Sequence, residues 1–135
     1  MSKEENRILH PPGWPRPRGY ANGIVASGST IFLSGMVGWS AEGVLVSPDF
    51  VEQASQALRN IIAVLAEAGG RPENVVRLTW YVLDKSEYLN SYKELGVAYR
   101  EVMGHHFPAM TAVEVKGLMP QGARLEIEAT AVLPR

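Results

Sequence analysis

The sequence contains no cysteine, which excludes disulfide frameworks, thiolate metal sites and catalytic thiols. It also has almost no net charge, because 13 Lys and Arg residues face 14 Asp and Glu residues. A general nucleic-acid binder gains its affinity by neutralising phosphates, so this balance argues against that class. Neither a glycine-rich phosphate loop nor a Gly-x-Ser-x-Gly nucleophile motif occurs. The sequence therefore lacks the motifs of a phosphate-loop nucleotide-binding protein and of a hydrolase with a serine nucleophile.

Long hydrophobic runs are missing as well. The most apolar helical stretch, residues 61–68, is interrupted by Glu67 and is too short to span a bilayer. The first seven residues are polar and carry both signs of charge, unlike the basic start and apolar stretch of a secretory signal. The sequence is therefore expected to be that of a cytoplasmic protein.

What is present is typical of one globular domain. The chain has 135 residues, and 46% of them are apolar. Four of its nine prolines lie within residues 1–20. Proline fixes the backbone and removes a hydrogen-bond donor, so residues 1–19 are expected to form an arm without a helix or a central strand. Residues 20–135 are expected to form the domain.

Hydrophobic periodicity and turn residues predict two helices and five strands. The expected helices run from a Ser47 cap, with Pro48 at the first helical position, to Gly69-Gly70, and from a Ser86 cap to Gly104. The expected strands are a hairpin of residues 23–27 and 30–39, a strand at 75–83, and strands at 110–118 and 123–133 joined by a turn at 120–122. The order ββαβαββ implies an α+β domain with both helices on one face of a sheet.

The opposite face of that sheet has mixed polarity. Alternation in the central strand places Val76, Leu78, Trp80 and Val82 on one face and Arg77, Thr79 and Tyr81 on the other. In the last strand, Glu126 and Glu128 alternate with Leu125 and Ile127. This second face meets either water or a partner subunit, and its valines and aromatic residues favour association.

Few side chains are candidates for chemistry. His105 and His106 are adjacent, so on a strand they would point to opposite faces and could not easily share a metal ion. Ser34 has no evident base beside it. Glu126 and Glu128 are either solvated residues of an edge strand or candidate general acids or bases, since burial would raise the pKa of a carboxylate toward neutrality. Spacing does not choose between the two glutamates.

Six segments, read in order, resemble the Rid family, the YjgF-type reactive intermediate deaminases that are also named L-PSP endoribonucleases. They are RGY at 18–20, FLSGM at 32–36, QASQALRNI at 53–61, FPAM at 107–110, VEV at 113–115 and LEIEA at 125–129. The resemblance extends from about Tyr20 to Val132, which is nearly the whole chain. It implies a chorismate-mutase-like fold, and a homotrimer whose sheets form a central barrel with sites in clefts between subunits.

The resemblance also implies an activity. Members of the family hydrolyse short-lived enamines and imines, such as 2-aminoacrylate, to 2-keto acids and ammonia, with water as the nucleophile and without a cofactor or metal. By the same resemblance, Glu126 would position or activate the water and Tyr20 would contact the leaving amine or its neighbour. The other implied binding residues are Gly35, whose backbone would face the ligand, Tyr81, and the segment Phe107, Pro108, Ala109 and Met110.

Two positions depart from the family pattern. The proline that precedes the family's tyrosine is missing before Tyr20, and Met110 stands where the family has an arginine that binds the substrate carboxylate. Methionine has neither a charge nor a donor, so a charged amino-acid imine would lose a contact of about 1.5–3 kcal/mol. The ligand would then be more apolar or aromatic, which Trp39 and Trp14 would suit. Alternatively its acid group would be held by another cation, for which the candidates are Arg16, Arg18, Lys116 and Arg124.

Three functions remain open at this point. The leading one is an imine or enamine deaminase with an atypical, less carboxylate-dependent substrate. The second is a trimer that binds a metabolite or a protein without catalysis. The third is an endoribonuclease or translation inhibitor, which the balanced charge disfavours.

Overall fold

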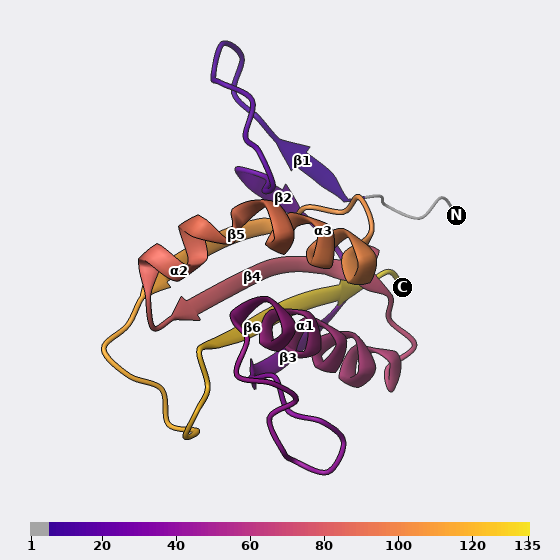
Figure 1. Cartoon of the computed structure of the whole chain (residues 1–135). Coiled ribbons are helices and arrows are strands. Elements are labelled where there is room, and N and C mark those ends of the chain that lie inside the picture. Colours follow the sequence, from indigo (N-terminus) through magenta and orange to yellow (C-terminus); the bar gives the residue numbers. More distant parts are fainter. Residues whose placement is uncertain (1–5) are drawn as a thin grey trace.

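The computed structural model describes residues 6–135 (Figure 1). The first five residues of the predicted arm lie outside the described residues. The centre of the fold is a four-stranded sheet in the order β3-β6-β4-β5. Strand β4 pairs with β5 in parallel, and the other two pairings are antiparallel, so the sheet is mixed as expected. The strands are β3 (Ser29–Met36), β4 (Val75–Val82), β5 (Ala109–Glu114) and β6 (Leu125–Leu133).

Three helices cover one face of this sheet (Figure 1). They are α1 (Phe50–Ala66), α2 (Lys85–Asn90) and α3 (Tyr92–Met103), and a short 3-10 turn, η1 (Pro72–Asn74), precedes β4. Alternate residues of the two central strands are buried under the helices, as the alternation predicted. These core residues include Leu78, Trp80 and Val82 of β4, Leu125, Ile127 and Ala129 of β6, and Leu58, Ile61 and Leu65 of α1.

The helix caps differ from the prediction. Helix α1 is capped by Asp49, whose Oδ2 accepts the Glu52 N–H at 3.0 Å, rather than by Ser47. Ser47 instead accepts the N–H of Asp49 at 2.9 Å and so supports the capping residue. The second predicted helix begins at an Asp84 cap, not at Ser86, because Asp84 Oδ1 accepts the Ser86 N–H at 2.9 Å.

Ser91 divides the second predicted helix into α2 and α3. Its backbone leaves the helical region, with φ −99° and ψ 12°, so residues 6–135 contain three α-helices where two were expected. Gly104 ends α3 with φ +65°, as predicted.

The predicted hairpin of residues 23–27 and 30–39 is wrong. Strand β2 (Gly23–Val25) pairs with β1 (Arg7–Leu9) in a separate two-stranded sheet, and β3 pairs with β6. The reason lies at Gly28, where a β-carbon would overlap the carbonyl oxygen of Leu133. The backbone is pressed against the end of β6 there, so it passes from one sheet to the other instead of turning back. The arm, in which neither a helix nor a central strand was expected, contributes β1 to this separate two-stranded sheet.

Two further details of the sheet differ from expectation. The ladder of β4 on β6 is irregular between Val75 and Arg77, so Val75, and not Val76, is the fully buried core residue. The last two strands are joined by the loop that was predicted, but β4 lies between them. Strand β6 is consequently central, which places Glu126 in the interior of the sheet rather than on an edge strand.

The start of β6 is fixed by Gln53, a fully buried polar residue of α1. Its Nε2 donates to the carbonyl oxygens of Ser47 at 2.8 Å and Gly122 at 3.1 Å. Its Oε1 accepts the Arg124 N–H at 2.8 Å. One side chain therefore joins the loop before α1 to the loop that leads into β6.

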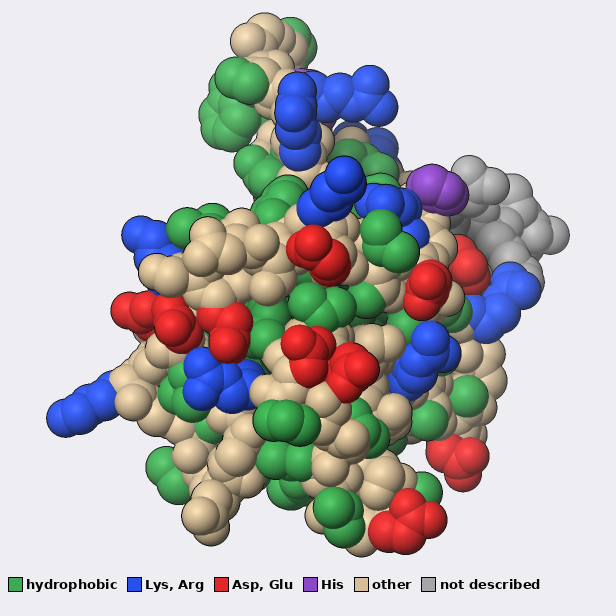
Figure 2. Space-filling model, viewed as in Figure 1, with side chains coloured by type: hydrophobic (Ala, Val, Ile, Leu, Met, Phe, Trp, Pro, Cys, Tyr) green, Lys and Arg blue, Asp and Glu red, His purple; other side chains and the backbone are tan. Residues whose placement is uncertain are grey.

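The surface matches the balanced composition. Figure 2 shows basic and acidic side chains interspersed over this view of the molecule. Within residues 6–135, no helix has both the length and the apolar character needed to cross a membrane.

Candidate functional site

Glu126 lies on the face of the sheet that the helices leave open. Its neighbours in β6, Leu125 and Ile127, are buried in the core, so its side chain points the other way. It is half-buried and pairs across the ladder with Tyr81 of β4. A β-carbon at Gly35 would lie 2.6 Å from its Oε2, so the carboxylate rests against the backbone of β3. The structure thus brings together three of the predicted site residues.

The hydroxyl of Tyr81 distinguishes the two glutamates. It donates to Glu128 Oε1 at 2.7 Å. This hydrogen bond, together with burial and the charges of Glu128 and Glu126, raises the pKa of Tyr81 above its ordinary value. Tyr81 is therefore a neutral donor held by Glu128. Glu126 forms no hydrogen bond or ion pair with another residue between 6 and 135, so its oxygens are available to a water molecule.

Tyr20 and the segment from Phe107 to Met110 form a second group. The N–H of Ala21 donates to the Pro108 carbonyl at 3.0 Å, and Ala21 bridges to Ala109, so the end of the arm lies along the start of β5. Tyr20 and Met110 line one hollow of about 230 Å³, which we call the Tyr20 hollow. Its other lining residues are Arg18, Gly19, Tyr88, Tyr92 and Ala112.

A cavity of about 210 Å³, which we call the aromatic pocket, adjoins this hollow between α3 and β4–β5. The two share Arg18, Gly19, Tyr88, Tyr92 and Met110. The walls that the pocket has alone are Trp80, Leu95, Gly96, Tyr99, Arg100 and Phe107. Five of its eleven lining residues are aromatic, and its charged members are the two arginines.

The aromatic residues of the pocket pack on one another. The ring of Tyr88 meets Trp80 and Tyr92 edge to face, with centroids 6.1 and 6.2 Å apart. Phe107 stacks on Tyr99 at 5.4 Å. Burial raises the pKa of Tyr88 and of Tyr99, so both hydroxyls are protonated at neutral pH. Trp80 is 2% exposed, and its indole N–H has no hydrogen-bond partner within residues 6–135, which is unusual for a buried donor.

Met110 and Glu126, one residue from each group, lie on opposite faces of the sheet. Met110 pairs across the ladder with the core residue Leu78 and packs against the helix-side core. Glu126 faces the open side with Tyr81 and Gly35. Within one chain, the glutamate and the Met110 side chain are therefore separated by the sheet itself.

Trp39 belongs to neither group. It lies in the loop after β3, is 43% exposed and lines none of the three cavities described here. Asn60 of α1 holds this loop by donating to the carbonyls of Val37 at 3.0 Å and Trp39 at 2.9 Å. Trp14, on the arm, is 57% exposed and lines none of these cavities either. The expectation that these tryptophans lie near a ligand gains no support from the geometry.

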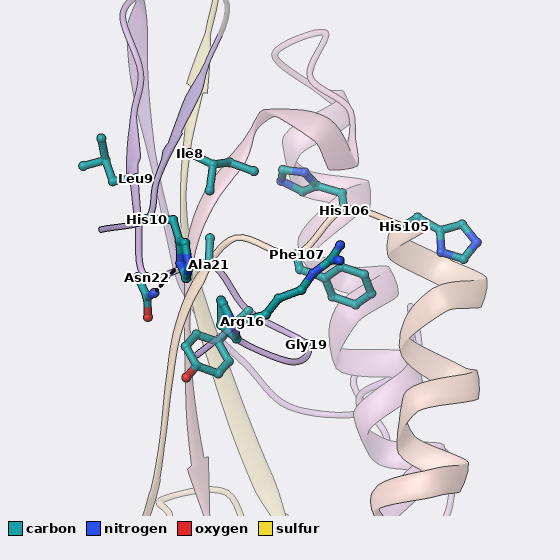
Figure 3. A pocket seen from close by; sticks show the side chains of 12 residues that line it. Ile8, Leu9, His10, Arg16, Gly19, Ala21, Asn22, His105, His106 and Phe107 are labelled. Carbon is teal, nitrogen blue, oxygen red and sulfur yellow. Dashed lines mark hydrogen bonds between the residues drawn. The ribbon is translucent and has the colours of Figure 1, made fainter. Parts of the chain in front are cut away.

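A third cavity, of about 470 Å³, lies between the arm and the loop after α3, and we call it the arm cavity (Figure 3). Figure 3 shows Arg16 extending across it toward Phe107, and His10, His105 and His106 on its walls. The Nε2 atoms of His10 and His106 bond to the carbonyls of Trp14 at 3.1 Å and Val75 at 2.6 Å, so they fix loops. No group of three or more His, Asp or Glu residues between 6 and 135 is arranged to hold a metal ion.

The four candidate cations are in different surroundings. Arg124 is engaged by Glu87 through two hydrogen bonds of 2.9 and 3.2 Å, which raise its pKa. Arg16 lines the arm cavity, and the exposed Lys116 lies in the loop between β5 and β6. Arg18 lines the same pocket as Met110. Arg100, which the sequence analysis did not single out, lines this pocket too. Its position one helical turn after Gly96 is the sequence feature that could have indicated it.

Comparison with known proteins agrees with this architecture. The family model described as endoribonuclease L-PSP matches residues 15–133. The human 2-iminobutanoate/2-iminopropanoate deaminase is 34% identical over 133 residues, covering 98% of this chain and 93% of that protein. A RutC family protein of Pyrococcus abyssi is 36% identical over 132 residues, covering 97% and 98%. A Rid-family protein of unknown function from Yersinia pestis has a TM-score of 0.81 at 32% identity, covering 95% and 98%.

The fold and the two residue groups define an α+β protein with a mixed sheet covered by helices on one face. The chain belongs to the endoribonuclease L-PSP family, also called the Rid or YjgF family. The resemblance seen in its six sequence segments is thereby confirmed. Its relatives include imine deaminases.

Proposed function

We propose that this protein hydrolyses a reactive enamine or imine to a carbonyl compound and ammonia. The observation that carries the proposal is the position of Glu126, a half-buried carboxylate without a partner in residues 6–135, held against the backbone of Gly35. A carboxylate so placed is suited to accept a proton from water. The names of the relatives support the same reaction class.

The reaction requires one water molecule and no redox step. The water oxygen attacks the imine carbon while Glu126 accepts a proton from it. That proton then passes to the nitrogen, which gives a carbinolamine. Glu126 next takes the proton of the new hydroxyl and delivers it to the amine, so the C–N bond breaks and ammonia leaves as the carbonyl forms. Tyr20 would contact the leaving nitrogen or its neighbour. No cofactor is required for this balance.

The complete site would lie between subunits. Glu126 and Met110 are on opposite faces of the sheet, so one chain does not bring these two side chains together. A second copy would supply the missing half, which supports the homotrimer that the family resemblance implies. The open sheet face also carries Phe32, 81% exposed, and the exposed Val113, which an adjoining subunit would cover.

The substrate would be atypical at residue 110. Met110 offers an apolar, flexible thioether where a carboxylate-binding arginine was expected, and the aromatic pocket lies beside it. Tyr81, on the glutamate side, would contribute to the cleft through Glu128. We therefore propose a substrate that depends less on a carboxylate contact at residue 110 and carries an apolar or aromatic group.

The test is ammonia release from freshly generated imines with and without an α-carboxylate. The wild-type chain should hydrolyse imines with aromatic or bulky apolar groups fastest, and Glu126→Gln should lower turnover by about 100-fold or more. Met110→Arg should shift preference toward small amino-acid imines, whereas Met110→Leu should not. Unchanged turnover in Glu126→Gln, with the fold intact by circular dichroism, would sink the proposal.

A second candidate is a ligand-binding trimer without catalysis. The absence of a charged group at Met110 favours it, since the family's main substrate contact is missing. A ligand that binds stoichiometrically and is recovered unchanged would support this function over hydrolysis. The endoribonuclease named by the family model is a third candidate, and a lack of RNA binding at low salt would exclude it.

A further inference from the structure

Two arginines that line the aromatic pocket, Arg18 and Arg100, form no ion pair within residues 6–135. Among residues 6–135, the ion-paired arginines are Arg71 and Arg124, so neither Arg18 nor Arg100 has a carboxylate beside it. Both line the aromatic pocket. Both side chains are exposed, and a guanidinium without a carboxylate partner is free to bind an anion with charge-assisted hydrogen bonds.

The backbone makes room for both arginines. A β-carbon at Gly96 would lie 3.3 Å from Arg100 Nη1, so the missing side chain lets the guanidinium fold back over α3 toward the pocket. Gly19, the residue after Arg18, has φ +76°, and a β-carbon there would lie 3.7 Å from the Tyr92 hydroxyl. The turn at Gly19 thus brings the arm, and Arg18 with it, against the aromatic wall.

The rest of the pocket is suited to an apolar planar group. Tyr88, Tyr92 and Trp80 form consecutive edge-to-face contacts, and Met110 adds a flexible apolar side chain. The buried N–H of Trp80, which has no partner in the described chain, indicates that a ligand or water completes this wall. The volume of about 210 Å³ admits a small molecule rather than a peptide.

We propose that the substrate is a 2-imino acid with an aromatic side chain, and that Arg18 and Arg100 together bind its carboxylate. The aromatic group would then lie among Tyr88, Tyr92 and Met110. This inference rests on the proposed function, because it assigns the substrate of the same site. Arg18 and Arg100 act here as specificity-determining residues, in place of a cation at residue 110.

The pocket can be tested without turnover, by calorimetric titration of the full chain with product-shaped probes. Phenylpyruvate carries both the ring and the acid group, pyruvate lacks the ring, and phenylacetone lacks the acid group. Phenylpyruvate should bind at least about tenfold more tightly than either of the others. Arg18→Gln and Arg100→Gln should each weaken phenylpyruvate binding about tenfold and leave phenylacetone binding unchanged.

Matched control variants are available on the arm and on another helix. Arg16→Gln alters an arginine two positions away that lines the arm cavity, and Arg59→Gln alters an exposed arginine of α1. Both should bind phenylpyruvate as the wild type does. The inference is overturned if phenylpyruvate does not bind, if phenylacetone binds equally well, or if Arg18→Gln and Arg100→Gln bind like the controls.

The same titration separates this inference from the proposed function. If the probes behave as expected but no imine releases ammonia, the pocket assignment stands and the deaminase proposal fails. If ammonia release depends on Glu126 while the arginine variants bind phenylpyruvate normally, the deaminase proposal stands and the pocket assignment fails.

Discussion

The carboxylate of Glu126 rests against Gly35 so closely that a β-carbon at residue 35 would lie 2.6 Å from Oε2 and 2.7 Å from the carboxyl carbon. Any side chain at this position must therefore move the carboxylate. The atoms in the way belong to the end of the Glu126 side chain and not to the backbone. A larger residue at position 35 would therefore displace the carboxylate without disturbing the fold.

Gly35→Ala should consequently reduce ammonia release by roughly 10- to 100-fold, since a displacement of about 1 Å at a reacting group has this effect. The free energy of unfolding should change by less than about 1 kcal/mol. Gly117→Ala is the matched control, because a β-carbon there would meet nothing within 4 Å. If both variants release ammonia at the same rate, catalysis does not depend on the position of the Glu126 carboxylate.

Mixed oligomers test whether the site is shared between chains. An oligomer made only of Glu126→Gln chains, or only of Tyr20→Ala chains, should be weakly active, because every cleft then lacks one of the two native side chains. When the two chains are co-expressed in equal amounts, about a quarter of the clefts would combine a native Glu126 from one chain with a native Tyr20 from another. Activity should then exceed the mean of the two variants. Activity that stays at that mean would place both residues in one chain's site.

Gln53 should be among the most sensitive polar residues for stability. It is fully buried and bonds to Ser47, Gly122 and Arg124. Gln53→Ala would leave buried backbone groups without partners and should lower the free energy of unfolding by about 2–4 kcal/mol in urea titrations. Gln56→Ala, which removes one side-chain bond to Asn60, should cost less than about 1 kcal/mol. Similar losses for both would contradict this role.

Tyr99 should make stability fall at alkaline pH. Burial raises its pKa above the ordinary value of about 10, so the folded chain holds the neutral phenol more strongly than the unfolded chain does. This contribution is complete below about pH 10 and is lost as the pH rises further. Tyr99→Phe loses the 2.6 Å hydrogen bond to the His106 carbonyl and should be about 1 kcal/mol less stable at pH 7.

The same variant should lose less stability than the wild type between about pH 9 and pH 11, because it no longer has this buried phenol to ionise. Thermal unfolding followed by circular dichroism at several pH values measures both effects. Parallel pH profiles for the two proteins would show that Tyr99 does not contribute.

Local patterns predicted much of the fold. The apolar stripe of α1 and the alternation of β6 are both borne out, because each depends on a period within a single element. The cap positions differ because Asp49 and Asp84, rather than the nearby serines, accept N–H groups of the first helical turns. The hairpin failed because its outcome depended on β1 and on the end of β6, which are distant in sequence.

The candidate site was predictable only in parts. Six segments indicated the family, and so named Glu126, Tyr20 and Met110. Nothing in their spacing showed that Met110 and Glu126 lie on opposite faces, since that depends on which strands pair and in which register. The sequence likewise did not distinguish Arg18 from the other three candidate cations, because its place beside the aromatic pocket depends on the path of the arm. The role proposed for Arg100 depends on its contact with Gly96, which only the structure shows.

The sheet that separates Glu126 from Met110 also insulates the two from each other's mutations. Side chains of the aromatic pocket can be exchanged without repacking the carboxylate, and the carboxylate can be kept while the recognised molecule changes. Under the proposed function, the group that recognises the substrate could therefore change while the group that reacts with it stays the same. Redesign of this chain for a new substrate would best begin on the helix side, leaving the open face untouched.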